Sequence, residues 1–240
     1  MNEFANLAMD DTIADVDVLG GNGPMETGVY PATITMAYHE KSAGGALGIK
    51  LSLDINGRSV NQTLWATSGD AKGNKNTWKK GDKSGYLPGF VAANHVALLA
   101  SGQSLQAVMN SSEEKVIKVY DFDTKSDQPT TKRVMVDLLN KEISLGMEKI
   151  TVNKEEKDGN GDYQPTSETR DINEIVKVFH AKDGRTVAEI KGQSDTGTFR
   201  DQWADKYTGV TRIKAKNIAS STGAIGGVAS VAKPTEALFQ

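Results

Sequence analysis

Leu47-Gly48-Ile49-Lys50-Leu51-Ser52-Leu53-Asp54-Ile55 alternates apolar residues with small or polar ones, and Asn56-Gly57 follows directly. A period of two is typical of a strand with one buried face and one face in water. Asn-Gly favours a tight hairpin turn because both residues tolerate positive φ angles. The sequence therefore predicts two antiparallel strands, over residues 46–55 and 59–67.

A similar alternation precedes this hairpin. Over residues 29–39 the apolar side chains fall on one parity, at Tyr30, Ala32, Ile34, Met36 and Tyr38. This pattern predicts a first strand that turns all five of these side chains toward the core.

Trp65 falls on the polar face of the third predicted strand. Val60, Leu64 and Ala66 take the inward parity, so Trp65 points outward. An aromatic ring on a hydrated sheet face is suited to stacking on unpaired bases. The alternative is that Trp65 packs beneath a loop or a helix, because tryptophan is mostly buried in proteins.

The order of the remaining elements indicates a fold class. They are predicted as a loop over 68–85, a helix from Leu87-Pro88-Gly89-Phe90 to Gly102, a short helix over 105–109, a strand over 115–122 ended by Pro129, a strand pair over 134–138 and 143–152, a polar excursion over 153–171, a hairpin over 173–181 and 186–190, and a helix over 198–207. Three strands, a helix and two more strands is the order of the OB-fold. We therefore expect a mainly β protein: an elaborated five-stranded OB-fold-like barrel with one or two helices, an extra β-hairpin and flexible termini.

The composition argues against several functional classes. The 240 residues include no cysteine, which excludes disulfides, a thiol nucleophile and thiolate-bound zinc. The histidines His39, His95 and His180 have no metal-ligand spacing. Residues 158–162 carry alternate aspartates but lack the glutamate of a calcium loop, so a glycine-rich turn is the preferred interpretation.

The chain also lacks the common catalytic signatures. It has no nucleophile elbow, phosphate-binding loop or dinucleotide-binding glycine motif. It has no apolar run with the length of a membrane span, and residues 1–11 do not resemble a secretory leader. We expect a protein that is not an enzyme, has no cofactor and has no membrane partner.

Charge is distributed unevenly along the chain. Residues 1–27 hold six carboxylates and no lysine or arginine, whereas residues 28–85 hold eight cations against four carboxylates. Such a distribution suggests a body that binds anions and an acidic arm that occupies its groove or recruits basic partners. A solvated acidic tail is the alternative.

Cations and aromatic residues gather on and just after the second and third strands. Lysines and arginine can follow phosphates, and aromatic rings can stack on any base. The alternative is an ordinary solvated basic loop. The predicted DNA-binding residues are Lys50, Arg58, Trp65, Lys72, Lys75, Trp78, Lys79, Lys80, Lys83 and Tyr86.

The termini differ from the body in composition. We expect an acidic disordered arm over 1–27, one OB-fold-like domain with insertions over 28–217, and a flexible Ala/Ser/Gly-rich tail over 218–240. Residues 236–240, Glu-Ala-Leu-Phe-Gln, are similar to the retained side of a picornaviral protease site, and we interpret them as a tag remnant.

Several short runs together resemble single-stranded DNA-binding proteins of tailed bacteriophages. The runs are Gly28-Val29-Tyr30-Pro31-Ala32-Thr33-Ile34-Thr35-Met36-Ala37-Tyr38, Lys41-Ser42-Ala43-Gly44-Gly45-Ala46, Gln62-Thr63-Leu64-Trp65-Ala66-Thr67, Leu87-Pro88-Gly89-Phe90 and Gly209-Val210-Thr211-Arg212. The resemblance covers residues 28–217 and rests on the order of these runs. It implies an OB-fold and the coating of unwound DNA during phage replication or recombination, in the cytoplasm of an infected bacterial host.

The position of the acidic residues departs from this class of proteins. Many of its members recruit replication enzymes through an acidic C-terminal tail, whereas here the acidic residues lie in the N-terminal arm. Partners among phage or host replication proteins are therefore expected at that arm. The competing hypotheses are a phage structural or assembly β-protein that does not bind nucleic acid, and a β-barrel that binds a small ligand.

Overall fold

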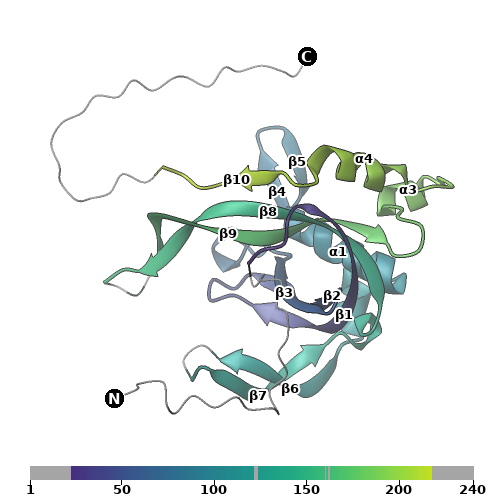
Figure 1. Cartoon of the computed structure of the whole chain (residues 1–240). Helices are drawn as coiled ribbons and strands as arrows, with labels where there is room; N and C mark the ends of the chain where they lie inside the picture. The colour runs from purple at the N-terminus through teal and green to yellow at the C-terminus, as the bar shows by residue number, and fades with distance from the viewer. Residues whose placement is uncertain (1–22, 122–123, 160, 162, 218–240) are drawn as a thin grey trace, which may run out of the picture. The chain divides into compact units, whose positions relative to one another are not determined.

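The computed structural model describes residues 23–121, 124–159, 161 and 163–217. These residues form a mainly β structure with ten strands and four α-helices (Figure 1). The chain divides into two compact units. Of the described residues, those from 23 to 150 and from 171 to 212 form the first unit, and those from 151 to 170 and from 213 to 217 form the second.

Three antiparallel strands begin the first unit, as predicted. They are β1 (Gly28–Lys41), β2 (Leu47–Ile55) and β3 (Arg58–Trp65). The turn between β2 and β3 places Asn56 and Gly57 at φ angles of 54° and 82°, which explains why this dipeptide stands there.

A β-bulge in β1 changes which residues face the core. The register of β1 against β2 shifts between Ile34 and Met36, so Ala37, opposite Leu51, becomes fully buried. Met36 pairs with Ser52 and Tyr38 pairs with Lys50, which places both on the outer face. The predicted inward parity of Met36 and Tyr38 is therefore wrong, because one extra residue reverses the alternation beyond it. Tyr38 is nevertheless buried, at 4% exposed, with Lys132 over its ring on the outer face.

The predicted loop over 68–85 contains ordered structure. It holds a 3-10 turn, η1 (Asp70–Lys72), and a two-stranded hairpin of β4 (Thr77–Lys80) and β5 (Lys83–Tyr86). All but one of the hairpin's strand residues are exposed, so no apolar alternation marked it in the sequence. Gly81, at a φ of 59°, lies in the turn.

Two helices follow and cover one side of the sheet. In α1 (Pro88–Ser101) the buried residues Val96 and Ala97 join the same core as Ile49 and Leu51. Gly102, at a φ of 75°, ends this helix as predicted. The side chain of Ser104 caps α2 (Leu105–Asn110), which agrees with the predicted short helix.

The next elements differ most from the prediction. β6 (Glu113–Asp121) pairs with β7 (Ser126–Val134), and Pro129 lies inside β7 opposite Lys118 instead of ending a strand. Val136–Leu138 forms the 3-10 turn η2, not a strand. The segment predicted as a polar excursion over 153–171 belongs to two long paired strands, β8 (Glu142–Lys157) and β9 (Tyr163–His180).

β1 has two partners along one edge. It pairs with β8 from Gly28 to Thr33, and it pairs with β7 at Tyr38. The main sheet runs β10-β8-β1-β2-β3, with β9 beside β8. Strand pairing among the described residues does not close this sheet into a barrel.

The C-terminal part contains α3 (Val187–Lys191), α4 (Thr198–Tyr207) and β10 (Thr211–Ile213). The predicted hairpin strand over 186–190 is wrong. These residues belong to α3, which begins with a reciprocal capping box between Thr186 and Glu189. α4 was predicted correctly. No helix in the described part of the chain is long and apolar enough to cross a membrane.

Residues 23–27, predicted as the end of the arm, belong to the folded first unit. The side-chain amide of Asn173 bonds both the N–H and the carbonyl of Met25, at 2.8 Å each. Thr27 is 1% exposed, and its Oγ1 donates to the Val210 carbonyl at 2.5 Å. The fold therefore begins before Gly28. The rest of the arm and the predicted tail, including 236–240, lie outside the described residues.

The second unit consists of the outer parts of β8 and β9, which form a two-stranded ribbon, and of residues 213–217 beside β8. The N–H groups of Lys214 and Ala215 donate to the Thr151 carbonyl at 2.9 and 3.0 Å. Asn153 bonds both the N–H and the carbonyl of Lys216. Asn160 and Asp162 lie outside the described residues, so the predicted turn over 158–162 is described only in part.

Candidate nucleic-acid interface

Four of the predicted DNA-binding residues line one cavity. We call this the tryptophan cavity; it has a volume of about 540 Å³ and is lined by Ser68, Lys72, Lys75, Thr77, Trp78, Lys79, Ser84 and Leu87. The walls come from η1, the residues before β4, and the β4–β5 hairpin. A tryptophan and three lysines thus line one concave site.

Trp78 is held against the opposite strand of its hairpin. It pairs with Gly85, and a Cβ atom placed on Gly85 would lie 3.1 to 3.2 Å from three atoms of the indole. The ring therefore lies across the glycine, where a larger residue would displace it. Trp78 remains 42% exposed, so part of the indole is available to a ligand.

Hydrogen bonds order the segment that carries the lysines. The N–H of Ser68 donates to the Lys75 carbonyl at 2.9 Å, and the N–H of Lys75 donates to Ser68 Oγ at 3.1 Å. Asn74, at a φ of 51°, donates through Nδ2 to the Gly45 carbonyl at 3.0 Å. This segment is therefore fastened to the β1–β2 loop, although it has few buried side chains.

The lysines of this region are not engaged in ion pairs with the described residues. No carboxylate of the described residues forms a salt bridge with any of them. Free ammonium groups in a concave site attract anions without first breaking an internal ion pair. The lysines concerned are Lys72, Lys75, Lys79, Lys80 and Lys83.

Trp65 lies at the end of β3 with one side exposed. It is 38% exposed and pairs with Gly48, where an added Cβ atom would lie 3.0 Å from Trp65 Cε3. α1 approaches the backbone of Trp65 closely, because a Cβ atom on Gly89 would lie 2.1 Å from the Trp65 carbonyl oxygen. The predicted outward orientation is thus accompanied by tight packing of the backbone beneath it.

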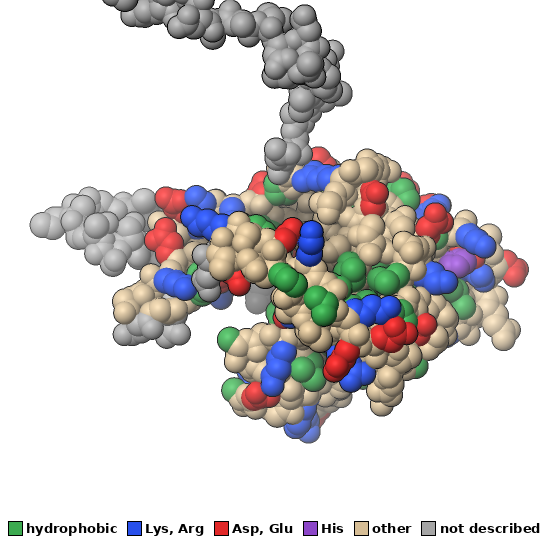
Figure 2. Space-filling model, turned by 90° about the horizontal axis from the view of Figure 1, so that it is seen from below, with side chains coloured by type: hydrophobic (Ala, Val, Ile, Leu, Met, Phe, Trp, Pro, Cys, Tyr) green, Lys and Arg blue, Asp and Glu red, His purple; other side chains and the backbone are tan. Residues whose placement is uncertain are grey.

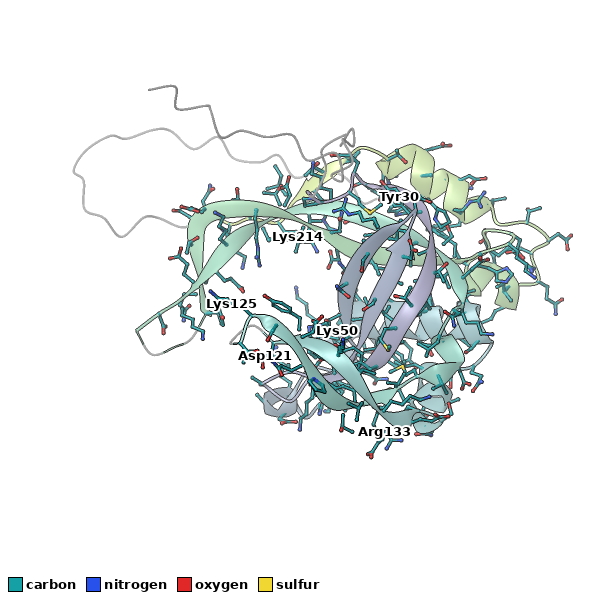
Figure 3. The ribbon with its side chains drawn as sticks, turned by 60° about the horizontal axis from the view of Figure 1, so that its bottom comes forward. Tyr30, Lys50, Asp121, Lys125, Arg133 and Lys214 are labelled. Carbon is teal, nitrogen blue, oxygen red and sulfur yellow. The ribbon has the colours of Figure 1, made fainter. Side chains whose placement is uncertain are left out.

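Lys50 lies in the middle of the outer face of β2 (Figure 3). Its cross-strand neighbours are Tyr38 on β1 and Thr63 on β3. Lys132 of β7 covers Tyr38, with its Nζ 5.4 Å from the ring centre and 3.3 Å from Glu40 Oε1. The outer face is therefore partly covered from the β7 side.

The other predicted residues lie apart from the cavity walls. Lys80 pairs with Lys83 at the tip of the β4–β5 hairpin, and Tyr86 at its base packs against Phe90 with ring centres 5.1 Å apart. Arg58 lies at the opposite end of β3 from Trp65, and its Nη2 donates to the Gly23 carbonyl. Arg58 thus fastens the N-terminal segment and does not join the cluster.

The β6–β7 hairpin was not predicted to contribute to the site. Its tip carries Asp121 and Lys125 and its base carries Arg133 (Figure 3). Val116 and Tyr120 on β6 are exposed. The sequence could not show which side chains of β6 face outward, because apolar residues occupy both parities of this strand.

A second cationic and aromatic cavity of about 420 Å³ lies against α4. Lys177 and Lys206 line it with Phe199 and Tyr207. The Lys177 Nζ lies 5.4 Å from the Phe199 ring centre, and Lys206 Nζ lies 5.2 Å from that of Tyr207. These cations already contact aromatic rings of the protein.

Side chains of both charges occur on the face of the molecule that Figure 2 shows. In Figure 2, Lys and Arg side chains are interspersed with Asp, Glu and hydrophobic side chains. Within the described ranges, no three metal-ligating side chains come together. The tryptophan cavity is therefore a local site defined by its geometry. No protein-family model matches the chain, and no significant match to it was found among curated proteins.

Proposed function

We propose that the protein is a non-catalytic, largely sequence-independent single-stranded DNA-binding protein. The observation that carries this proposal is the tryptophan cavity, in which Trp78 lies beside Lys72, Lys75 and Lys79. The ammonium groups would neutralise phosphates, and the indole would stack on a base, at about 1 to 3 kcal/mol per base. Neither contact reads base edges, which accounts for tolerance of sequence.

We also propose that the strands form an elaborated OB-fold-like barrel. The order β1-β2-β3-α1-β8-β9 and the pairing of β1 with both β2 and β8 support this arrangement. At the remaining gap, Gln62 Nε2 of β3 donates to the Asn173 carbonyl of β9 at 3.0 Å. Met25 bonds the same asparagine, so residues 23–27 would complete the closure.

Other predicted residues would extend the binding path. Trp65 and Lys50 would continue it over the outer face of β2 and β3. Lys80, Lys83 and Tyr86 would continue it along the β4–β5 hairpin. Arg58 would contribute little, because it is engaged with Gly23.

The cellular role is proposed from the resemblance of residues 28–217 to phage single-stranded DNA-binding proteins. The protein would act in DNA replication or recombination in the cytoplasm of an infected bacterium. The carboxylates of the N-terminal arm would recruit phage or host replication proteins, since basic partners are attracted to that charge.

A fluorescence titration with poly-dT at two salt concentrations, with duplex DNA as control, tests the proposal. We expect the single strand to quench tryptophan emission, the affinity to fall steeply with salt, and the duplex to bind much more weakly. No response to either nucleic acid, together with tight self-association, would favour the structural or assembly β-protein instead.

A variant of the stacking residue tests the site itself. We expect Trp78→Ala to weaken poly-dT binding by about tenfold or more with little change in the salt slope, because stacking releases no counterions. Tyr163→Ala is the matched control, since Tyr163 is exposed but lies in the other compact unit. Equal affinities of the two variants would remove Trp78 from the interface.

A further inference from the structure

A third cavity, larger than the two described above, lies at the end of the sheet near α1 and α2. We call it the histidine cavity; its volume is about 590 Å³, within the usual range for small-molecule sites. His39 of β1, Phe90 of α1 and Met109 of α2 contribute to its lining. Lys75 and Thr77 line both this cavity and the tryptophan cavity, so the two are neighbours.

The wall of the histidine cavity combines an apolar side with amides and cations. Phe90 and Met109 supply apolar surface, and Asn76 and Asn110 bring side-chain amides that make no hydrogen bond within the described part of the chain. Lys75 and Arg133 supply positive charge. Because no lining residue is a carboxylate, the chemistry of the cavity favours an anionic ligand with a flat apolar body.

His39 carries a polar atom that the fold leaves unpaired. Its Nε2 is buried and has no hydrogen-bond partner among the described residues. Burial, and then the nearby Arg133, lower the pKa of His39, so the imidazole is neutral at neutral pH. An unpaired buried polar atom costs about 1 to 3 kcal/mol, and such atoms are few in native structures. Nε2 is closed to solvent as the ring stands, so a ligand in the cavity would reach it once the imidazole turns about its Cβ–Cγ bond, and the hydrogen bond would then remove this cost.

Arg133 is already oriented by the protein. Its Nε donates to Ser112 Oγ and its Nη2 donates to the Ser112 carbonyl, both at 3.1 Å. These bonds give the guanidinium a fixed direction and leave its Nη1 available to a ligand. No carboxylate of the described residues pairs with it.

We propose that the histidine cavity binds one nucleotide. The base would lie against Phe90 and Met109, with its edge hydrogen-bonded by His39 Nε2 and the free amides, and the phosphate would lie at Arg133 and Lys75. The nucleotide is either a free mononucleotide or one residue of a bound strand. The inference rests on this cavity and not on the proposed strand-binding function.

Calorimetric titration of the full chain with dAMP, deoxyadenosine and inorganic phosphate tests the inference. We expect dAMP to bind more tightly than deoxyadenosine, and phosphate alone to bind most weakly. His39→Phe should weaken dAMP binding by about five- to tenfold without lowering the melting temperature, because the phenyl ring keeps the volume and removes the unpaired atom. Arg133→Gln should weaken dAMP binding about tenfold and leave deoxyadenosine unchanged.

Lys118→Gln, on the exposed part of β6, is the matched control and should bind dAMP as the unaltered protein does. Absence of dAMP binding at millimolar concentration would overturn the inference, as would equal affinities of His39→Phe, Arg133→Gln and the control.

Competition distinguishes the two sources of the nucleotide. If dAMP displaces poly-dT, the cavity takes a residue of the strand; if both bind together, it takes a free nucleotide. Failure of poly-dT to bind would refute the proposed function while leaving the dAMP result intact.

Discussion

At the scale of single residues, Asp183 makes the stability of the fold depend on pH. Its carboxylate accepts hydrogen bonds from Arg185 Nε at 2.9 Å and from the Arg185 N–H at 3.0 Å, and it contacts His180 Nδ1 at 2.9 Å. The side-chain hydrogen bond from Arg185 is the main cause that holds the Asp183 pKa well below its ordinary value of 3.8. The stabilisation is thus fully present above that value and is lost as the pH falls toward the folded-state pKa.

Asp183→Asn should therefore be less stable than the unaltered protein at pH 6, and the difference should narrow below about pH 4. Urea unfolding of both proteins at pH 6, 4 and 3 measures this difference in the free energy of unfolding. Asp195→Asn, on an exposed residue, serves as control and should show no such narrowing. A constant difference between Asp183→Asn and the unaltered protein across this range would contradict the assignment.

At the scale of elements, the segment from η1 to β4 concentrates the charge that we assign to phosphate binding. Neutralising Lys72, Lys75 and Lys79 to glutamine should reduce the magnitude of the salt slope of poly-dT binding by about two, since each contact with a single strand contributes about 0.7. Lys182→Gln, at an exposed lysine in the turn between β9 and α3, should leave the slope unchanged. An unaltered slope in the triple variant would place the phosphates elsewhere.

The elements that the sequence predicted are those with one buried face. β1, β2, β3, α1 and α4 pack against the core, so burial imposes a readable period on them. β4, β5 and the outer parts of β8 and β9 are exposed on both faces, so no alternation marks them. β6 and β7 do have one half-buried face, but apolar residues occupy both parities of β6 and the half-buried residues of β7 before Val134 are polar, so the sequence does not show that face.

Two local features also could not be predicted from the alternation of apolar and polar residues. The bulge after Ile34 depends on how β1 meets β2, which periodicity within β1 does not contain. The capping box of Thr186 and Glu189 overrode an alternation that suggested a strand. At the candidate site, the sequence could only name Trp78, the lysines and Arg58 as candidates. The structure adds that Trp78 lies across Gly85, and that Arg58 lies at the far end of β3, apart from the lysines.

At the scale of the whole molecule, Thr27 joins segments that are far apart in sequence. Its Oγ1 accepts a hydrogen bond from the Lys149 N–H at 2.8 Å while donating to the Val210 carbonyl. Its own carbonyl accepts from the Gly209 N–H at 2.9 Å. One hydroxyl therefore holds the chain before β1, the middle of β8 and the turn after α4 together.

Thr27→Val keeps the shape of this side chain but removes the hydroxyl, so the Lys149 N–H and the Val210 carbonyl lose their partner. We expect a loss of about 1 to 3 kcal/mol in the free energy of unfolding, measured by urea denaturation. Thr35→Val is the matched control, because Thr35 Oγ1 bonds the Ser52 carbonyl at 3.0 Å on an exposed part of β1 where water can replace it. Equal losses in the two variants would show that the Thr27 contacts do not fasten the fold. Because Thr27 lines neither the tryptophan cavity nor the histidine cavity, the folded variant should bind poly-dT and dAMP as the unaltered protein does, which separates stability from recognition.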